Sequence, residues 1–189
     1  MSGRDGEQRS AIVFGARNLG RAVIETLVAD GWAVAGSAQS QSTLDGVRAA
    51  GALALKADIT DPASVHAALE EAAAAHGGID LAVNAASAYG GDSREPFGGG
   101  PIVEAELGAF DAWAAPPARA AFSFLSASGR FALDQGRAAT LIQVTGGSAR
   151  RAMPGRGLWA AGAFGVRAIT NAAALELRPQ GIHVALLNC

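Results

Sequence analysis

Residues 11–27 read Ala-Ile-Val-Phe-Gly-Ala-Arg-Asn-Leu-Gly-Arg-Ala-Val-Ile-Glu-Thr-Leu, and this stretch decides the fold. It begins as a buried strand, turns between Gly15 and Gly20, and continues with the spacing of a helix. A strand that turns sharply into a helix directs the free N–H groups of the helix N-terminus at the space above the turn, which suits a phosphate. The two glycines match the outer glycines of the dinucleotide fingerprint, with Arg17 in the place of the middle one.

Length and composition bound the class of protein. The 189 residues, half of them hydrophobic, suffice for one core and predict a single domain over residues 1–189. The formal net charge of −2 does not indicate a nucleic-acid-binding surface. The single cysteine, Cys189, excludes an intrachain disulfide. Residues 1–9 form a polar tail without the apolar core of a signal peptide, and no apolar run reaches the roughly 18 residues of a membrane helix. We therefore expect a soluble, cytoplasmic protein without nucleic-acid or membrane partners.

Short apolar runs alternate with helical spacing along the chain. The runs that predict strands are residues 11–14, 32–37, 53–56, 81–84, 140–145 and 183–187. The predicted helices are residues 19–30, 42–50, 62–76, 116–134 and 158–177. This alternation indicates parallel strands joined by right-handed crossovers. The sequence therefore predicts an α/β fold, a Rossmann-like doubly wound parallel sheet of about six strands in the order 3-2-1-4-5-6, with helices on both faces.

Two regions interrupt the regular pattern. Residues 87–101 are rich in glycine and contain Pro96, which predicts a mobile loop at the carboxyl end of the sheet, where ligands bind in such folds. Pro116 and Pro117 cannot lie inside a helix without loss of backbone hydrogen bonds. We therefore expect the main helix to begin at one of these prolines, with residues 110–115 forming a separate turn.

Three further motifs follow in order. Ala-Asp-Ile-Thr-Asp at residues 57–61 follows the third strand, Asp-Leu-Ala-Val-Asn-Ala-Ala-Ser at residues 80–87 forms the fourth strand and its exit, and Pro-Gln-Gly-Ile-His-Val at residues 179–184 leads into the sixth. Together they resemble the short-chain dehydrogenase/reductase family from Ser10 to Asn188. That family shows Asp-Val/Ile-Thr/Ser-Asp, Asn-Asn-Ala-Gly and Pro-x-Gly-Ile-x-Val at these places.

The resemblance implies a dinucleotide cofactor across the carboxyl ends of the strands and a small-molecule substrate that the sequence does not identify. The glycine turn would wrap the pyrophosphate, Asp58 would bind the adenine amino group, and the exit of the fourth strand would line the ribose. The residues expected to bind the cofactor are Gly15, Arg17, Asn18, Leu19, Gly20, Ser37, Asp58, Ile59, Asn84, Ala85 and Ala86. The alternatives are that Asp58 is a turn or cap residue and that Asn84 only closes the end of a strand.

The residues after the second strand bear on the type of dinucleotide. Enzymes that use NAD usually carry an acid about twenty residues past the fingerprint. Residues 37–40 read Ser-Ala-Gln-Ser here, without an acid. Arg17 would bind the 2′-phosphate of NADP as a charge-assisted partner, unless it is a solvated loop residue. We expect NADP(H) to be favoured over NAD(H).

The catalytic positions of the family are substituted. The family uses a Tyr as general acid and base, a Lys four residues later, a Ser thirteen residues before the Tyr, and an Asn in the preceding helix. Alignment with this chain gives Trp159, Ala163 and Gly146 at the first three positions and places the Asn at or near Pro117. None of these residues supports the same proton chemistry, and loss of a general acid costs about 10²–10⁴-fold in rate. By resemblance the chain is an oxidoreductase, but we expect weak or no activity, as in a pseudo-enzyme.

Other side chains are weaker substitutes. Tyr89 is the only tyrosine and follows the fourth strand, and Thr145 and Ser148 carry hydroxyls beside the vacant Ser position. Each also fits an ordinary loop or strand residue. The three histidines show no metal-ligand spacing, so no metal site is expected. The rival hypotheses are an active NADPH-dependent reductase that uses non-standard residues and a non-catalytic interaction protein that acts through a helical face.

The last helix bears on assembly. Family members commonly associate through their fourth and fifth helices, so we expect a homo-oligomer, a dimer or a tetramer. The small residues that would allow close helix approach are Ala161, Gly162, Ala163 and Gly165. The family normally continues past its sixth strand with a substrate-covering lobe and a seventh strand. Both are absent from these 189 residues, so we expect a pocket that is open on one side.

Overall fold

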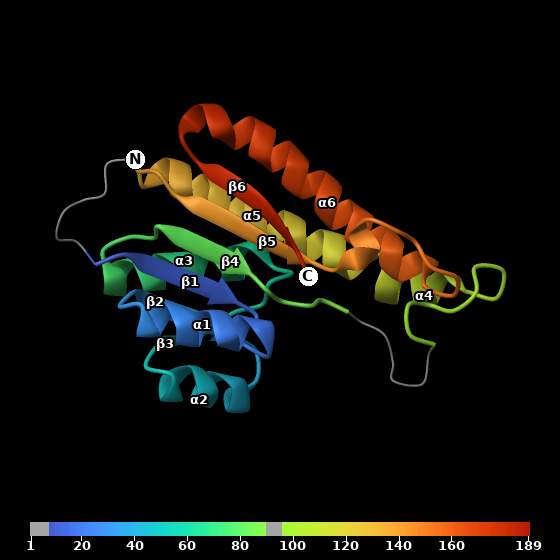
Figure 1. Cartoon of the computed structure of the whole chain (residues 1–189), viewed down its shortest axis with the longest axis horizontal. Helices are drawn as coiled ribbons and strands as arrows, with labels where there is room; N and C mark the ends of the chain where they lie inside the picture. Colours follow the sequence, from blue (N-terminus) through green and yellow to red (C-terminus); the bar gives the residue numbers. More distant parts are fainter. Residues whose placement is uncertain (1–7, 90–95) are drawn as a thin grey trace.

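The computed structural model describes residues 8–89 and 96–189. Most of the polar N-terminal tail and the centre of the loop predicted at residues 87–101 lie outside the described residues. A six-stranded sheet with the strand order β3-β2-β1-β4-β5-β6 forms the middle of the molecule (Figure 1). Its strands are β1 (Ser10–Phe14), β2 (Ala33–Ala38), β3 (Leu53–Lys56), β4 (Leu81–Asn84), β5 (Thr140–Thr145) and β6 (His183–Asn188). All neighbouring strands pair in parallel, which confirms the predicted doubly wound sheet.

The helices are α1 (Leu19–Ala29), α2 (Gln41–Ala49), α3 (Pro62–His76), α4 (Leu107–Trp113), α5 (Ala115–Asp134) and α6 (Gly157–Leu177), with 3₁₀ turns η1 (Gly147–Ala149) and η2 (Arg178–Gln180). Five of the helices follow the predicted pattern, and α4 was not predicted. Local sequence explains the bounds of α3, because the Asp61 carboxylate caps the Ala63 N–H and Gly77 ends the helix with a φ of 78°. Among the described residues, the structure contains no helix that combines the length and the apolar character needed to cross a bilayer.

Two apolar clusters cover the two faces of the sheet. Ile12 and Phe14 of β1 pack on one face beneath α3, α5 and α6, where the ring of Phe14 meets that of Phe124 with centroids 5.8 Å apart. Val13 points to the other face and packs with Ile24 of α1 and residues of α2. Because side chains alternate along a strand, β1 is buried on both faces. This double burial explains why its sequence is a continuous apolar run.

The corner between α4 and α5 differs from the prediction. Residues 110–115 do not form a separate turn, because α4 begins at Leu107 and the helical path breaks only at Ala114. Pro116 and Pro117 lie in the first turn of α5, where a missing N–H costs no helical hydrogen bond. The helix break expected before the two prolines is therefore present, and it separates α4 from α5.

The small residues of α6 are used inside the chain. A Cβ on Gly162 would lie 2.9 Å from the Ala114 carbonyl oxygen, and one on Gly165 would lie 3.1 Å from the Ala118 Cβ. Both glycines therefore allow α6 to lie close to α4 and α5. The interpretation that they serve association with another copy is not needed to explain them.

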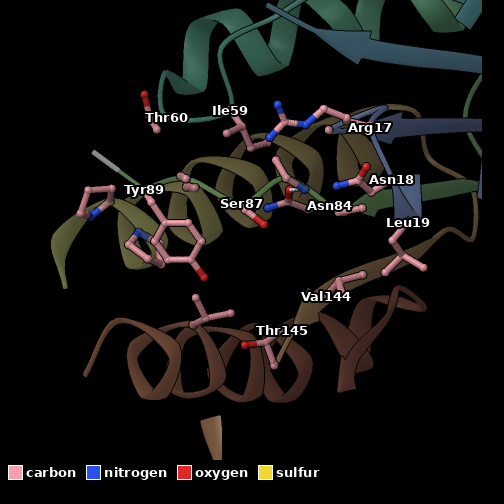
Figure 2. Close-up of a pocket in the computed structure, with 18 of the residues that line it drawn as sticks. Arg17, Asn18, Leu19, Ile59, Thr60, Asn84, Ser87, Tyr89, Val144 and Thr145 are labelled. Atoms are coloured by element: carbon pink, nitrogen blue, oxygen red, sulfur yellow. Dashed lines mark hydrogen bonds between the residues drawn. The ribbon is translucent and has the colours of Figure 1, made fainter. Parts of the chain in front are cut away.

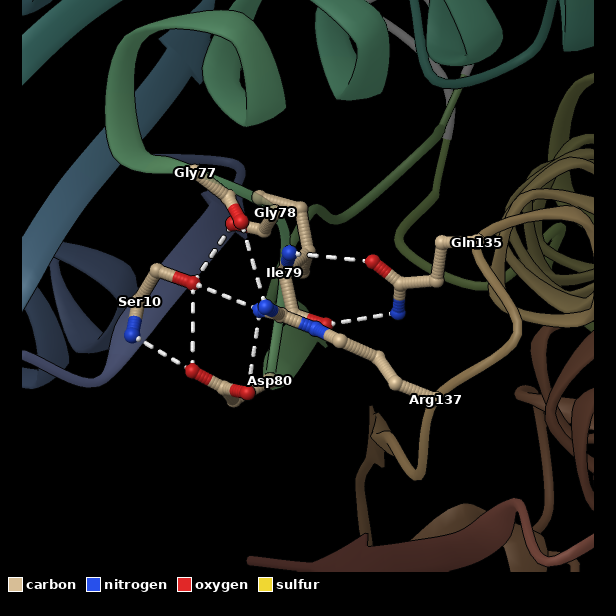
Figure 3. A network of polar contacts seen from close by, with 7 residues as sticks. All are labelled: Ser10, Gly77, Gly78, Ile79, Asp80, Gln135 and Arg137. Carbon is tan, nitrogen blue, oxygen red and sulfur yellow. Dashed lines mark hydrogen bonds and ion pairs between the residues drawn. The ribbon is translucent and has the colours of Figure 1, made fainter. Parts of the chain in front are cut away.

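A polar network ties together the loops at the amino ends of β1, β4 and β5 (Figure 3). Asp80 accepts hydrogen bonds from the Ser10 N–H at 2.9 Å and forms an ion pair with Arg137 at 3.0 Å. The Gln135 amide pairs with both backbone groups of Ile79, at 3.2 and 2.8 Å. We call these residues the amino-edge network: Ser10, Gly77, Gly78, Ile79, Asp80, Gln135 and Arg137.

Candidate functional site

A cavity of about 760 Å³ opens at the carboxyl ends of the strands (Figure 2). Its walls come from the turn after β1, the end of β2, the loops after β3 and β4, the start of α5, the segment after β5, and α6. These segments meet because parallel strands end at the same edge of a sheet. All the residues expected to bind a cofactor line this cavity except Gly20, and so do the positions Gly146, Trp159 and Ala163.

Glycine is required at two places in the turn after β1. The Ser37 carbonyl accepts hydrogen bonds from the N–H groups of Gly15 and Ala16, at 3.1 and 3.0 Å, and so fixes the turn. Gly15 has a φ of 80°, and a Cβ there would collide with the backbone of Ala86. Gly20 does not reach the cavity, because it packs directly against the Gly15 carbonyl. Its role is to bring α1 close to the turn.

The turn itself closes differently from the sequence interpretation. The Gly20 N–H donates to the Arg17 carbonyl oxygen at 3.0 Å, and Asn18 lies between them with φ 48° and ψ −110°. Among the described residues, Asn18 is the only non-glycine residue with positive φ. The place of the middle glycine is therefore held by Asn18 and not by Arg17. The ψ of −110° at Asn18 lies outside the left-handed helical region that asparagine adopts most often, so this conformation favours glycine.

Arg17 is exposed and lies at the mouth of the cavity. Figure 2 shows its side chain extended along the cavity toward Ile59. Among the described residues that line the cavity, only Arg17 and Asp58 carry a charge at neutral pH. The lining at the end of β2 and the start of α2 is uncharged: Ser37, Ala38, Gln39, Ser40 and Thr43.

One carboxylate oxygen of Asp58 is hydrogen-bonded within its own loop. Its Oδ1 accepts hydrogen bonds from the N–H and the hydroxyl of Thr60, at 2.9 and 2.8 Å, and the Ser64 hydroxyl accepts from the Asp58 N–H at 2.9 Å. This is an Asx-type turn, as in the structural alternative. Its Oδ2 has no partner among the described residues, which leaves one oxygen for a ligand.

Asn84 is buried and holds the exit of β4. Its Nδ2 donates to Gln143 Oε1 at 2.9 Å, and its Oδ1 accepts from the Ala86 N–H at 3.0 Å. The Ala85 N–H donates to the Phe14 carbonyl oxygen at 2.9 Å. The side chain of Asn84 therefore closes the strand end, while Ala85 and Ala86 present a small surface to the cavity.

The structure brings Tyr89 and Trp159 together at the other end of the cavity. The Trp159 indole N–H donates to the Tyr89 hydroxyl oxygen at 2.5 Å. Burial raises the pKa of the Tyr89 phenol, and the hydrogen bond from Trp159 acts in the opposite direction. Sequence reasoning named both residues but not their contact, because they are 70 positions apart and no local pattern links them.

Ser148 lies next to the vacant Ser position. A Cβ on Gly146 would be 3.9 Å from the Ser148 Oγ. Ser148 is buried, and its Oγ has no hydrogen-bond partner among the described residues. Thr145 also lines the cavity, at the end of β5. Hydroxyl groups are therefore present here, although the expected serine position is a glycine.

Two residues that sequence reasoning missed complete an aromatic cluster around Tyr89. Phe97 packs on Trp159 and Trp113, with ring centroids 4.7 and 5.0 Å apart, and Tyr89 packs on the same two indoles at 6.3 and 5.6 Å. The Arg156 guanidinium lies over Phe97, 5.3 Å from its centroid. We call Tyr89, Phe97, Trp113 and Trp159 the aromatic cluster.

Metal-ligating residues are not gathered in the described part of the chain, where no group of three or more His, Cys, Asp or Glu side chains is placed to hold an ion. His183 begins β6 and pairs with Thr140. It therefore lies at the amino edge of the sheet, away from the cavity.

Comparison with known proteins agrees with this geometry. Residues 13–188 match the family model described as enoyl-(acyl carrier protein) reductase. The short-chain dehydrogenase/reductase eriH of Hericium erinaceus is 31% identical over 183 residues, covering 91% of this chain and 69% of that protein. The 3-oxoacyl-[acyl-carrier-protein] reductase FabG of Salmonella typhimurium is 40% identical over 82 residues, covering 41% of this chain. That match spans only 34% of the FabG reductase.

A solved structure shows the same fold. The short-chain dehydrogenase/reductase of Burkholderia phymatum, crystallised with NAD, aligns with a TM-score of 0.80 at 22% identity. The alignment covers 96% of this chain and 65% of that one. Because the family model matches residues 13–188 and eriH is similar over most of its length, the chain belongs to the short-chain dehydrogenase/reductase family.

Proposed function

We propose that this protein binds NADP(H) in the cavity at the carboxyl ends of its strands, as an oxidoreductase by family whose usual catalytic residues are missing. One observation carries the proposal. A single cavity is lined by all the expected cofactor-binding residues except Gly20 and also by the substituted positions Gly146, Trp159 and Ala163. Binding is therefore supported at the same place where the proton-transfer groups are lacking.

The start of α1 would hold the pyrophosphate. No described side chain caps this helix, and although the Gly20 N–H donates to the Arg17 carbonyl oxygen, the N–H groups of Leu19 and Arg21 have no partner among the described residues. They are available to an anion, and the helix dipole favours negative charge there. Gly15 has no Cβ, which lets the backbone of Ala86 pack directly against the turn. These features fit a diphosphate group that approaches the backbone closely.

The charges around the cavity favour the phosphorylated cofactor. Arg17 supplies a cation at the cavity mouth, and the lining residues at the end of β2 include no carboxylate. A carboxylate there would bind ribose hydroxyls and repel a 2′-phosphate. A charge-assisted hydrogen bond contributes about 1.5–3 kcal/mol, which corresponds to a preference for NADPH over NADH of about tenfold or more.

The opposite end of the cavity supports weak catalysis or none. A bound nicotinamide supplies the hydride, but the chain must supply the proton. The Trp159 indole does not release a proton near neutral pH, and Ala163 carries no charge that could lower the pKa of a neighbour. We therefore expect a rate lower by about 10²–10⁴-fold than a general acid would give.

A second copy of the chain is the macromolecular partner that we propose. Phe122 and Leu133 of α5, and Phe164 and Leu175 of α6, are exposed apolar side chains. Burial of such side chains against the same helices of another copy would remove them from water. Light scattering during size-exclusion chromatography should give a dimer or a tetramer, and a monomer at high protein concentration would contradict this expectation.

The test of the cofactor is a calorimetric titration of the full chain with NADPH and NADH. We expect tighter binding of NADPH. Equal or tighter binding of NADH would overturn the preference, and no binding of either would overturn the cofactor assignment itself.

The loss of activity has its own test. A panel of carbonyl and enoyl substrates should show little or no turnover with NADPH, and fast turnover would contradict the loss. Combining Gly146→Ser, Trp159→Tyr and Ala163→Lys in one chain should restore activity that none of the single variants shows.

A further inference from the structure

The hydrogen bond between Trp159 and Tyr89 has a fixed direction. An indole N–H donates and cannot accept, so the Tyr89 oxygen is the acceptor. The phenolic hydrogen of Tyr89 is therefore available to another acceptor. Both side chains line the cavity, and Figure 2 shows the Tyr89 hydroxyl directed toward α6 and the wall that carries Thr145.

The aromatic cluster holds Tyr89 in place. Its ring packs on Trp113 with centroids 5.6 Å apart and on Trp159 at 6.3 Å, and Phe97 packs on both indoles. Aromatic pairs at such separations stabilise each other beyond the area they bury. The phenol is thus oriented before any ligand arrives, which lowers the entropy that binding must offset.

Among the described residues, the side chains that line the cavity around this hydroxyl are uncharged, and Arg156, which lies over Phe97, is not one of the lining residues. Arg17 and Asp58 follow β1 and β3, whereas the Tyr89 end of the cavity is formed after β4 and β5 and by α5 and α6. Pro116 and Pro117 face the cavity from the start of α5. A donor among uncharged walls that include the flat rings of Trp159, Pro116 and Pro117 fits a neutral, flat molecule with an acceptor oxygen, because a charged ligand would lose its hydration without a charged partner.

We propose that Tyr89 donates the hydrogen bond that binds the oxygen of an uncharged, flat carbonyl compound in this cavity, with Trp159 as its positioning residue. This inference rests on the proposed function, since it assigns the substrate end of the same cavity. The donor comes from the segment after β4, whereas the family's tyrosine position is Trp159, now used to orient Tyr89.

A pair of matched probes tests the donor. 2-Acetylnaphthalene has a carbonyl oxygen, and 2-ethylnaphthalene has nearly the same shape without it. Titrations of the full chain with each probe, followed by ligand-observed NMR in the presence of saturating NADPH, should show about three- to tenfold tighter binding of the ketone, as expected for one hydrogen bond. Tyr89→Phe should abolish this difference and leave the affinity for the hydrocarbon unchanged. Equal affinity of the wild-type chain for both probes, or a preserved ketone preference in Tyr89→Phe, overturns the proposal.

Two variants test the positioning role. Trp159→Phe keeps an aromatic ring but removes the N–H, and it should reduce the ketone preference and raise the pKa of Tyr89, because the lost hydrogen bond favours the phenolate. Tyr89 is the only tyrosine, so its ionisation can be followed directly by ultraviolet absorbance. Trp113→Phe is the matched control, since the Trp113 N–H has no hydrogen-bond partner among the described residues. Equal effects of the two variants would contradict the positioning role.

NADPH affinity separates this inference from the proposed function. Tyr89→Phe and Trp113→Phe should bind NADPH as the wild-type chain does. If the wild-type chain binds no NADPH, the proposed function fails, and the two probes titrated without NADPH still decide the role of Tyr89.

Discussion

Arg137 at the amino edge of the sheet and Arg17 at its carboxyl edge are both loop arginines, but only Arg137 is held by the protein itself. Arg137 is 17% exposed; it pairs with Asp80 and donates to the Gly77 carbonyl oxygen at 3.1 Å. The Arg17 side chain is exposed and donates no hydrogen bond to the described residues. Polar groups that are paired inside the protein hold its loops together, whereas groups left free at a cavity are available to a ligand.

The other polar groups follow the same division. The amino-edge network joins three loops through hydrogen bonds between its own members (Figure 3). At the carboxyl edge, Ser148 Oγ, the free hydrogen of Tyr89 and the N–H groups of Leu19 and Arg21 in α1 lack protein partners among the described residues. Changes at the amino edge should therefore alter stability, and changes to these free groups at the carboxyl edge should alter binding.

Gly78→Ala should have the largest effect. Gly78 has a φ of 125°, and a Cβ there would lie 2.5 Å from the Arg137 Cζ, whose guanidinium is held by Gly77 and Asp80. We expect the free energy of unfolding in urea to fall by about 2–4 kcal/mol, from backbone strain and loss of the ion pair.

Gly77→Ala is the control for this variant. Gly77 also has positive φ, but a Cβ there would meet no atom within 4 Å. It should cost about 1 kcal/mol, from conformation alone. Equal losses in the two variants would show that Arg137 is not tightly held, and the comparison between the two arginines would fail.

Arg17→Ala should change binding without changing stability. Loss of one charge-assisted partner should weaken NADPH binding about tenfold, or about 1.4 kcal/mol, and leave NADH binding unchanged. Calorimetric titration measures both. Arg21→Ala is a suitable control, because Arg21 is exposed one turn away and pairs with Glu25. A similar loss for both cofactors would mean that Arg17 does not distinguish them.

Asn18→Gly should stabilise the protein, because glycine adopts the backbone of Asn18 without strain. We expect a gain of about 1 kcal/mol, seen as a higher midpoint of thermal unfolding. Asn18→Ala should give no such gain, since alanine has a Cβ as asparagine does and meets the same backbone strain. A lower midpoint of thermal unfolding for Asn18→Gly would show that the backbone of Asn18 is not strained.

His76 should give the smallest effect, as an unpaired group near the amino edge. Burial lowers the pKa of His76, and its Nδ1 has no partner among the described residues. The unfolded chain therefore binds a proton more readily than the folded one, so stability should fall as the pH drops below about 6.5. Urea unfolding at pH 7.5 and 5.5 should show this fall, and His76→Gln should reduce it. The prediction is contradicted if stability falls with pH as steeply in His76→Gln as in the wild-type chain. A smaller fall in His66→Gln would then assign the effect to His66.

Local signals in the sequence were sufficient for most of the fold. Asp61 and Gly77 mark the ends of α3, and the apolar run of β1 marks a doubly buried strand. The strand order follows from the alternation of elements. The exact turn at Asn18 could not be predicted, because it depends on which carbonyl accepts the Gly20 N–H.

The site was predicted only where it depends on short motifs. The turn after β1 and the exits of β3 and β4 were predicted, but sequence reasoning could not tell that Asn84 uses both its amide nitrogen and its amide oxygen to hold Gln143 and Ala86. The contact of Tyr89 with Trp159, and the packing of Phe97 on both indoles, arise from topology. Such contacts leave no periodic or local trace in a single sequence.

The placement of the tryptophans provides an optical consequence. Trp113 and Trp159 belong to the aromatic cluster, whereas Trp32 lies just before β2 with the Arg9 guanidinium 4.3 Å from its ring centroid. Fluorescence from the first two indoles therefore senses the cavity, while emission from Trp32 reports on the opposite end of the sheet. Singly tryptophan-containing variants would let one spectrum follow the filling of the cavity and another follow unfolding, in the same chain and without an attached dye.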